Sequence, residues 1–268
     1  MHFLLLGKIS PAQFLNQMAS SLFTGKHKIT LPEIGSTNDY AFSLLPENPP
    51  DGTLVRAITQ TAGRGQKGNH WVSAPGQNLT FSLIYYPRFL LAQEVFSLSK
   101  VICLGLRDAI STCLPWQEVL IKWPNDLLIN QQKIAGILIE NLLEGARLKA
   151  CVAGIGLNVN QTQFDANLSP PPTSMRKFAD ADLNLEEVLE TVFSHVEKYY
   201  LMLREGNKAK LDRTYLEHLY AYQEPHVFRA QEKLFTGVIQ GVDRYGRLAI
   251  MIEQELAYFD IKEVSFVW

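Results

Sequence analysis

Cysteine is scarce in this sequence and is not arranged for chemistry. The 268 residues include three cysteines, Cys103, Cys113 and Cys151, at wide spacing and without a C-x-x-C pair. This odd, scattered set argues against a disulfide framework and against a zinc site. The six histidines show no metal-ligand spacing either, so we expect no metal held by protein ligands alone. Three reduced thiols are typical of a cytoplasmic protein.

Long apolar runs and an excess of one charge are also missing. Residues 3–6 form an apolar run that is too short for a signal peptide and has no basic segment ahead of it. No run reaches the roughly 18 apolar residues of a membrane span. The 25 basic and 27 acidic residues give a net charge of −2, which provides no general attraction to DNA or to a membrane. We therefore expect a soluble, cytoplasmic protein that binds neither.

Glycine and positive charge are concentrated in one stretch, residues 60–71, which reads QTAGRGQKGNHW. A strand-like run, residues 53–58, precedes it. Glycines let the backbone approach a ligand closely, and successive amides in such a loop can bind an anion. Arg64 adds a planar donor group that suits a carboxylate or a phosphate. The loop alone leaves two interpretations open, an anion-binding loop and a solvated surface turn.

Four further motifs accompany this loop. Residues 36–39 read STND, residues 122–126 read KWPND, residues 133–140 read KIAGILIE after a tight turn at residues 131–132, and residues 154–160 read GIGLNVN. In this order the set resembles the biotin–protein ligase family, which carries S-T-N, a GRGR-type loop after a Gln, KWPND, K-[IL]-AGIL and G-x-G-x-N. The resemblance extends from about residue 28 to the end of the sequence. The combination is specific, whereas no single motif would be.

The resemblance implies an α+β fold with two parts. One is a class II synthetase-like catalytic domain, a mixed sheet flanked by helices, and the other is a small all-β, SH3-like C-terminal barrel. We divide the chain into an N-terminal extension (1–26), a biotin/lipoate ligase-type catalytic domain (27–221) and an SH3-like domain (222–268). The extension is too short for the winged-helix DNA-binding domain of some family members, so the expected type is the monofunctional ligase.

The apolar pattern supports this division. Strands are predicted at residues 27–31, 53–58, 78–86, 118–123, 127–130, 134–141 and 148–154, the last three as an antiparallel meander. Helices are predicted at residues 91–114, 184–203 and 208–220, with a shorter one at residues 10–23. Helices gathered between and beside the strands argue for an α+β sheet domain. Short alternating runs at residues 227–230, 234–242, 248–252, 256–261 and 264–267 predict the small barrel.

The family resemblance also implies a reaction. Members attach biotin, in an ATP-dependent reaction, to a specific lysine of a biotin carboxyl carrier domain of a carboxylase, through a biotinyl-5′-adenylate. Biotin and ATP would be substrates, and Mg²⁺ would arrive with the phosphates. The expected partner is therefore the carrier protein, and the sequence leaves a monomer and a homodimer both open.

The family resemblance implies catalytic roles for four residues, Lys133, Arg64, Asp126 and Lys122. Lys133 would contact the biotin carboxylate and the bridging phosphate oxygen, Arg64 would hold the same region from the loop, and Lys122 would face the triphosphate. Asp126 would reach the nucleotide or magnesium, or would orient the incoming amine or take its proton. The residues alone also allow plainer interpretations: a hairpin flank for Lys133, a solvated strand end for Lys122 and an Asx turn at Asp126. For Arg64 a surface ion pair is disfavoured.

Further binding residues follow from the same motifs. The expected biotin-binding residues are Ser36, Thr37, Asn38, Gln60, Gly63, Arg64, Gly65, Gln66, Lys133, Gly136, Gly154 and Gly156. The expected nucleotide-binding residues are Gln66, Asn69, Trp71, Lys122, Asn125, Asp126 and Asn158. Trp71 would stack on adenine or pack in the core, and the glycines at 136, 154 and 156 would leave space for ligand. Ser36 has a structural role as well, since Ser36 and Asp39 form a capping-box-like pattern at the start of a helix.

One position departs from the family pattern, and two other functions compete. The loop reads GRGQ, so Gln66 stands where many members have a second arginine.

A lipoate–protein ligase shares the fold and the adenylate chemistry, but Trp123-Pro124 favours biotin. A biotin-responsive regulatory protein is a second alternative, and the combination of Lys133 with Asp126 favours an enzyme instead.

Overall fold

The computed structural model of the chain describes residues 20–165 and 167–268. The predicted N-terminal extension and its helix at residues 10–23 lie mostly outside the described residues. Residues 20–26, which are described, form bends and turns and no helix. The predicted helix is therefore wrong at its C-terminal end.

A seven-stranded mixed sheet forms the larger part of the molecule, in the order β1-β2-β3-β7-β6-β5-β4. Its strands are β1 (Lys28–Ile34), β2 (Thr53–Gln60), β3 (Leu79–Tyr85), β4 (Leu120–Lys122), β5 (Asp126–Ile129), β6 (Gln132–Glu144) and β7 (Arg147–Leu157). Only β1 and β2 are parallel, and the predicted meander of β5, β6 and β7 is confirmed. The tight turn before β6 lies at Asn130 and Gln131, both with positive φ, one residue earlier than predicted.

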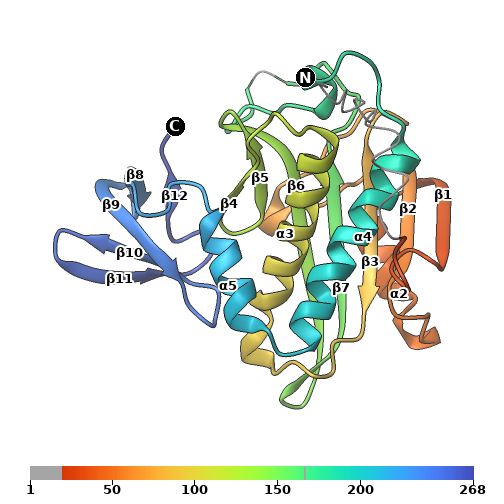
Figure 1. Ribbon diagram of the computed structural model, residues 1–268, viewed down its shortest axis with the longest axis horizontal. Helices are drawn as coiled ribbons and strands as arrows, with labels where there is room; N and C mark the ends of the chain where they lie inside the picture. Colours follow the sequence, from red (N-terminus) through yellow and green to blue (C-terminus); the bar gives the residue numbers. More distant parts are fainter. Residues whose placement is uncertain (1–19, 166) are drawn as a thin grey trace, which may run out of the picture.

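Helices cover both faces of this sheet. Figure 1 shows α3 (Phe96–Cys113), α4 (Leu185–Arg204) and α5 (Lys208–Glu217) together on one face. The short helix α2 (Thr37–Ser43) packs on the opposite face, against β2, β3 and β7. Side chains alternate accordingly, since Leu54 belongs to the main core and Val55 to the smaller cluster under α2. Covered on both sides, β3 is buried along its whole length.

The three helices predicted at residues 91–114, 184–203 and 208–220 are confirmed with adjusted ends. The 3₁₀ turn η3 (Ala92–Glu94) precedes α3, so the α-helix is shorter than the predicted span. Three more 3₁₀ turns are η1 (Leu45–Glu47), η2 (Gln66–Gly68) and η4 (Met175–Phe178). In the described part of the chain, no helix is long and apolar enough to cross a membrane.

The C-terminal segment forms a second, antiparallel sheet in the order β11-β10-β9-β8-β12. Its strands are β8 (Pro225–Ala230), β9 (Lys233–Val242), β10 (Leu248–Ile252), β11 (Glu255–Phe259) and β12 (Ser265–Phe266). All five lie at the predicted positions, and the α+β class is confirmed. The two sheets share one apolar core, which contains both Ile121 and Phe266. Trp123 Nε1 also donates to the carbonyl of Gly246 at 2.9 Å, which joins the end of β4 to the second sheet.

Candidate active site

A cavity of about 500 Å³ lies where α2, the glycine loop, the β4–β5 hairpin and the C-terminal sheet meet. Most of the predicted site residues line it: Ser36, Thr37, Asn38, Gln60, Arg64, Gly65, Gln66, Asn69, Trp71, Lys122, Asn125, Asp126, Lys133, Gly136, Gly154 and Gly156. Sequence reasoning missed the wall from the C-terminal sheet, which consists of Ile261, Lys262, Val264, Ser265, Phe266 and Trp268. Nothing in the motifs pointed to these six residues, because the contact exists only after the two sheets have packed.

Two lysines share one carboxylate on the cavity wall. Lys133 Nζ lies 2.7 Å from Asp126 Oδ1, and Lys122 Nζ lies 3.7 Å from Asp126 Oδ2. Strand pairing sets this geometry, because Lys122 is opposite Asp126 and Asp126 is opposite Gly136. Asp126 is only 9% exposed. The cluster has two cations and one anion, and its surplus positive charge suits an anionic ligand.

Lys122 is not the solvated strand end that the sequence also allowed. Its side chain is 16% exposed. Its ammonium lies over the rings of Phe266, 5.4 Å from the centroid, and Trp268, 5.9 Å away. Burial lowers the pKa of Lys122, Asp126 opposes this shift and the charge of Lys133 adds to it. A cation in such a site gains more from an incoming anion than a cation in water does.

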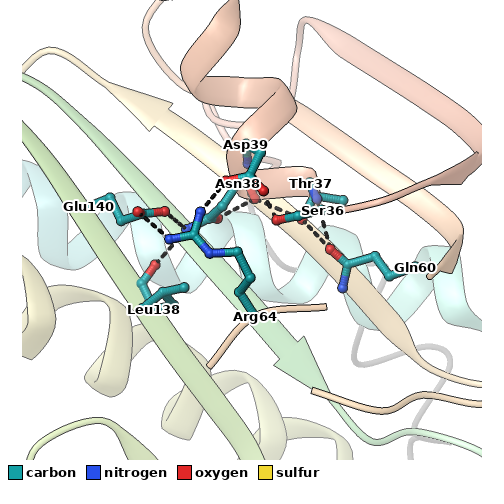
Figure 2. A network of polar contacts seen from close by, with 9 residues as sticks. Ser36, Thr37, Asn38, Asp39, Gln60, Arg64, Leu138 and Glu140 are labelled. Atoms are coloured by element: carbon teal, nitrogen blue, oxygen red, sulfur yellow. Dashed lines mark hydrogen bonds and ion pairs between the residues drawn. The ribbon is translucent and has the colours of Figure 1, made fainter. Parts of the chain in front are cut away.

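Arg64 is held in an ion-pair network, which the sequence analysis disfavoured. Figure 2 shows its guanidinium between Asp39 and Glu140, the latter at 2.6 Å. The other carboxylate oxygen of Glu140 accepts from Asn38 Nδ2 at 2.9 Å. These contacts fasten the glycine loop to α2 and β6. A ligand that contacts the Arg64 guanidinium therefore has to compete with the carboxylates of Asp39 and Glu140.

The start of α2 is tied into the sheet by polar contacts (Figure 2). The amide of Thr37 donates to Gln60 Oε1 at 2.8 Å. Ser82 on β3 donates to Asn38 Oδ1 at 2.6 Å, a contact that the sequence analysis missed. Ser36 caps α2 by accepting from the amide of Asp39, which confirms the predicted cap. The STND motif thus has a structural role whether or not it contacts biotin.

Side chains of the protein occupy the space beside Gly136, Gly154 and Gly156. A Cβ at Gly154 would lie 2.2 Å from Asn38 Oδ1, and one at Gly156 would lie 2.2 Å from Trp71 Cε2. At Gly136 the nearest atom would be Lys133 Cε at 3.1 Å. All three glycines also line the cavity, so the expectation that they leave room for a ligand stays a prediction. They position Asn38, Trp71 and Lys133.

Two predicted binding residues do not line the cavity. Gly63 is buried, and its carbonyl accepts the amide of Trp71 at 2.9 Å, which closes the loop on itself. Asn158 is 3% exposed, and its side chain donates to the carbonyl of Thr173 at 2.9 Å. Asn125 does line the cavity, where its amide donates to the carbonyl of Ile137 at 2.5 Å.

The described residues offer no metal cage of their own. No group of three or more His, Cys, Asp or Glu side chains lies close enough together to hold an ion in residues 20–165 and 167–268. Asp126 is the one Asp or Glu side chain among the described residues that line the cavity. A single carboxylate fits an ion such as Mg²⁺ that is carried mainly by the phosphates of a ligand.

The three cysteines are free, as predicted. Cys103 and Cys151 are buried, and Cys113 is partly buried. Burial raises the pKa of each thiol, that of Cys113 to about 12. They are therefore poor nucleophiles.

Comparison with known proteins assigns the sequence and the fold to a class. The profile described as the Biotin/lipoate A/B protein ligase family matches residues 31–158, which include the STND, loop, KWPND and KIAGILIE motifs. A solved biotin protein ligase from Aquifex aeolicus, in complex with biotin and ATP, is similar with a TM-score of 0.74. The two are 25% identical over 90% of this chain and 98% of that chain.

Curated relatives narrow the class. The chain is 31% identical to the biotin–[acetyl-CoA-carboxylase] ligase of Paracoccus denitrificans over 82% of this chain and 92% of that protein. It is 34% identical to the bifunctional ligase/repressor BirA of Bacillus subtilis over 72% of this chain, but it spans only 59% of that relative's length. The chain belongs to the biotin–protein ligase family.

Proposed function

We propose that this protein attaches biotin to a specific lysine of a biotin carboxyl carrier domain, using ATP and passing through biotinyl-5′-adenylate. The observation that carries the proposal is the Lys122–Asp126–Lys133 cluster on the wall of the cavity. The relatives named as biotin–[acetyl-CoA-carboxylase] ligases and the Aquifex complex with biotin and ATP support it.

The first step joins two anions. A carboxylate oxygen of biotin bonds to the α-phosphorus of ATP, and the bond from that phosphorus to the pyrophosphate oxygen breaks. Lys133 and Lys122 supply positive charge at one wall, and both must exchange part of their contact with Asp126 for contact with the substrates. An ion pair at ~4 Å is worth about 4 kcal/mol at an effective dielectric of 20. Only the part felt more strongly in the transition state raises the rate.

The second step transfers the acyl group. The amine of the acceptor lysine bonds to the acyl carbon, the bond to AMP breaks, and the amine loses a proton. Asp126 is the carboxylate on the cavity wall that can orient the amine or accept this proton. Once the ligand has drawn Lys122 or Lys133 away, Asp126 is released for this second role.

The remaining cavity residues bind and orient. Ser36, Thr37, Asn38 and Gln60 form the polar end where the biotin ring would lie. Trp71 presents an indole beside Lys133, whose ammonium lies 5.6 Å from the ring centroid, and adenine would stack on it. Mg²⁺ would neutralise phosphate charge when bound. Asn158 and Gly63 do not line the cavity and hold neighbouring backbone instead, through contacts with Thr173 and Trp71. These roles differ from the binding roles expected for them.

Mass spectrometry of an acceptor domain tests the proposal. The protein is incubated with a biotin carboxyl carrier domain, ATP, Mg²⁺ and either biotin or lipoate. We expect the carrier to gain one biotinyl group, and no gain without ATP or when the acceptor lysine is replaced by arginine. A gain with lipoate alone would replace the assignment by a lipoate ligase, and no gain with either acid would refute both.

A further inference from the structure

The C-terminal sheet brings two aromatic rings to Lys122. Phe266 on β12 is 8% exposed, and Trp268 is 42% exposed. Both rings lie within 6 Å of the Lys122 ammonium, at 5.4 and 5.9 Å from their centroids, which is the range of a cation–π contact. All three residues line the cavity.

The two rings are fixed relative to β4 by contacts that do not involve Lys122. Tyr220 stacks on Trp268 with centroids 5.5 Å apart and lies 5.8 Å from Phe266. The amide of Tyr220 donates to the carbonyl of Ile121 at 2.8 Å, next to Lys122 in the chain. The amide of Val267 donates to the carbonyl of Val227 at 3.0 Å, which holds the segment between the rings on β8. The aromatic wall is thus built against the strand that carries the lysine.

The chemistry of this wall differs from that of Asp126. A carboxylate in close contact neutralises a lysine, whereas an aromatic face attracts the cation without cancelling its charge. Lys122 lies farther from Asp126, at 3.7 Å, than Lys133 does, at 2.7 Å. The rings therefore lie beside the ammonium without cancelling its charge, whereas Asp126 neutralises part of it.

We propose that Phe266 and Trp268 are positioning residues, which hold the Lys122 ammonium beside Asp126 and facing the cavity so that a polyphosphate can contact it. The identity of that polyphosphate as ATP rests on the proposed function, but the positioning itself does not. The C-terminal sheet therefore supplies part of the nucleotide half of the site by orienting a residue of the first sheet.

The first test uses the ligand-free protein and needs no activity. Protons next to Nζ of a lysine that lies over aromatic faces resonate upfield in NMR spectra. We expect an upfield Lys122 signal, assigned by its loss in Lys122→Arg, which moves toward the ordinary lysine position in Trp268→Leu and largely returns in Trp268→Phe. A Lys122 signal at the ordinary position in the wild type would overturn the proposal, whatever reaction the protein catalyses.

The second test separates positioning from direct contact with nucleotide. In biotin-dependent ATP–pyrophosphate exchange, we expect Trp268→Leu to raise KM for ATP about three- to fivefold, with a smaller change in kcat, the size of one cation–π contact. In a Lys122→Met background the same substitution should have no further effect. Additive effects would show that Trp268 acts on the nucleotide itself and would overturn the proposal.

Tyr258→Leu is the matched control. Tyr258 is on β11 of the same sheet, is 46% exposed, and lies 5.0 Å from the guanidinium of Arg247, away from the cavity lining. We expect it to leave both the Lys122 signal and KM unchanged. If it raises KM as much as Trp268→Leu does, loss of sheet stability explains both variants and the positioning role is wrong.

The two tests also separate the positioning from the proposed function. A wild-type protein that shows the upfield Lys122 signal but catalyses no ATP–pyrophosphate exchange would refute the function and leave the positioning intact.

Discussion

At the scale of single residues, Asp126 determines how much positive charge the cavity presents. It contacts Lys133 at 2.7 Å and Lys122 at 3.7 Å, on a wall where the described residues provide no second Asp or Glu side chain. Asp126 thus neutralises part of the charge of both lysines, and an anionic ligand can replace it as their partner. Of the two, Lys133 makes the closer contact and is the more exposed, at 28% against 16%.

Replacing Lys133 by alanine should lower adenylate formation. The chain should still fold, because Lys133 is partly exposed and Asp126 keeps Lys122 as a partner. We expect biotin-dependent pyrophosphate release to fall at least about tenfold, since a charge directed at the reacting groups is lost. Lys149→Ala, which removes an exposed pair with Glu144 on the neighbouring hairpin, should leave the rate unchanged. Normal pyrophosphate release in Lys133→Ala would show that the assigned role is wrong.

Gln66 offers a gain-of-charge prediction. It lines the cavity in the loop at the position where many family members have a second arginine. A glutamine can bond to the adenylate but carries no charge, and charge-assisted hydrogen bonds are roughly twice as strong. We expect Gln66→Arg to slow dissociation of preformed biotinyl-adenylate, measured without acceptor protein. Equal or faster release from the variant would mean that the glutamine already holds the intermediate as well as an arginine does.

At the scale of elements, the glycine loop depends on β7 for its conformation. An added Cβ at Gly156 would lie 2.2 Å from Trp71 Cε2, so Gly156→Ala has to displace the indole and the loop behind it. We expect faster tryptic cleavage after Arg64 and a loss of adenylate formation of about tenfold or more. Gly35→Ala is the control, because nothing lies within 4 Å of a Cβ there. Cleavage at the wild-type rate in Gly156→Ala would show that the loop does not rest on Trp71.

Helix α4 anchors the first described residues through Glu197. Its carboxylate accepts the amides of Phe23 at 2.9 Å and Thr24 at 2.7 Å, and that of Leu22. Burial alone would raise the pKa of Glu197, but these amides more than offset it and the pKa lies below its ordinary value of 4.5. A carboxyl group with a lowered folded-state pKa stabilises the protein above its unfolded-state pKa, and the contribution is lost as pH falls through the folded-state pKa.

Glu197→Gln should therefore lower stability at neutral pH and have less effect in acid. We expect a loss of about 1–2 kcal/mol in the free energy of unfolding at pH 7 and a smaller loss at a pH well below 4.5, both measured by urea denaturation. Glu190→Gln on the same helix breaks only an exposed pair with Lys28 and should cost less than about 1 kcal/mol. A difference for Glu197→Gln that is the same at both pH values would contradict the anchoring role of the ionised carboxylate.

At the scale of the whole molecule, the charge balance predicts weak affinity for DNA. With 25 basic and 27 acidic residues, the chain has no general excess of positive charge to release counterions from a duplex. We expect a Kd no tighter than about 10⁻⁶ M for duplex DNA at physiological salt, measured by fluorescence anisotropy with and without biotin and ATP. Biotin-dependent, sequence-specific binding would contradict this prediction and favour the regulatory alternative.

The sequence by itself determined the elements and most of the site. Local periodicity specified the meander, helices α3 and α4 and all five C-terminal strands, because each pattern is complete within one segment. The motifs contain the cavity residues that come from α2, the glycine loop and the first sheet, but not those of the C-terminal sheet. Strand pairing alone brings Lys122, Asp126 and Gly136 together.

Only the tertiary structure decided which side chains contact one another across different elements. The pairing of Arg64 with Asp39 and Glu140, the packing of Trp71 on Gly156, and the burial of Asn158 all join segments far apart in the chain. The same holds for Phe266 and Trp268 beside Lys122. Such contacts depend on how separate elements pack in space. The pattern of polar and apolar residues along the sequence does not specify the distance between two segments in the folded protein.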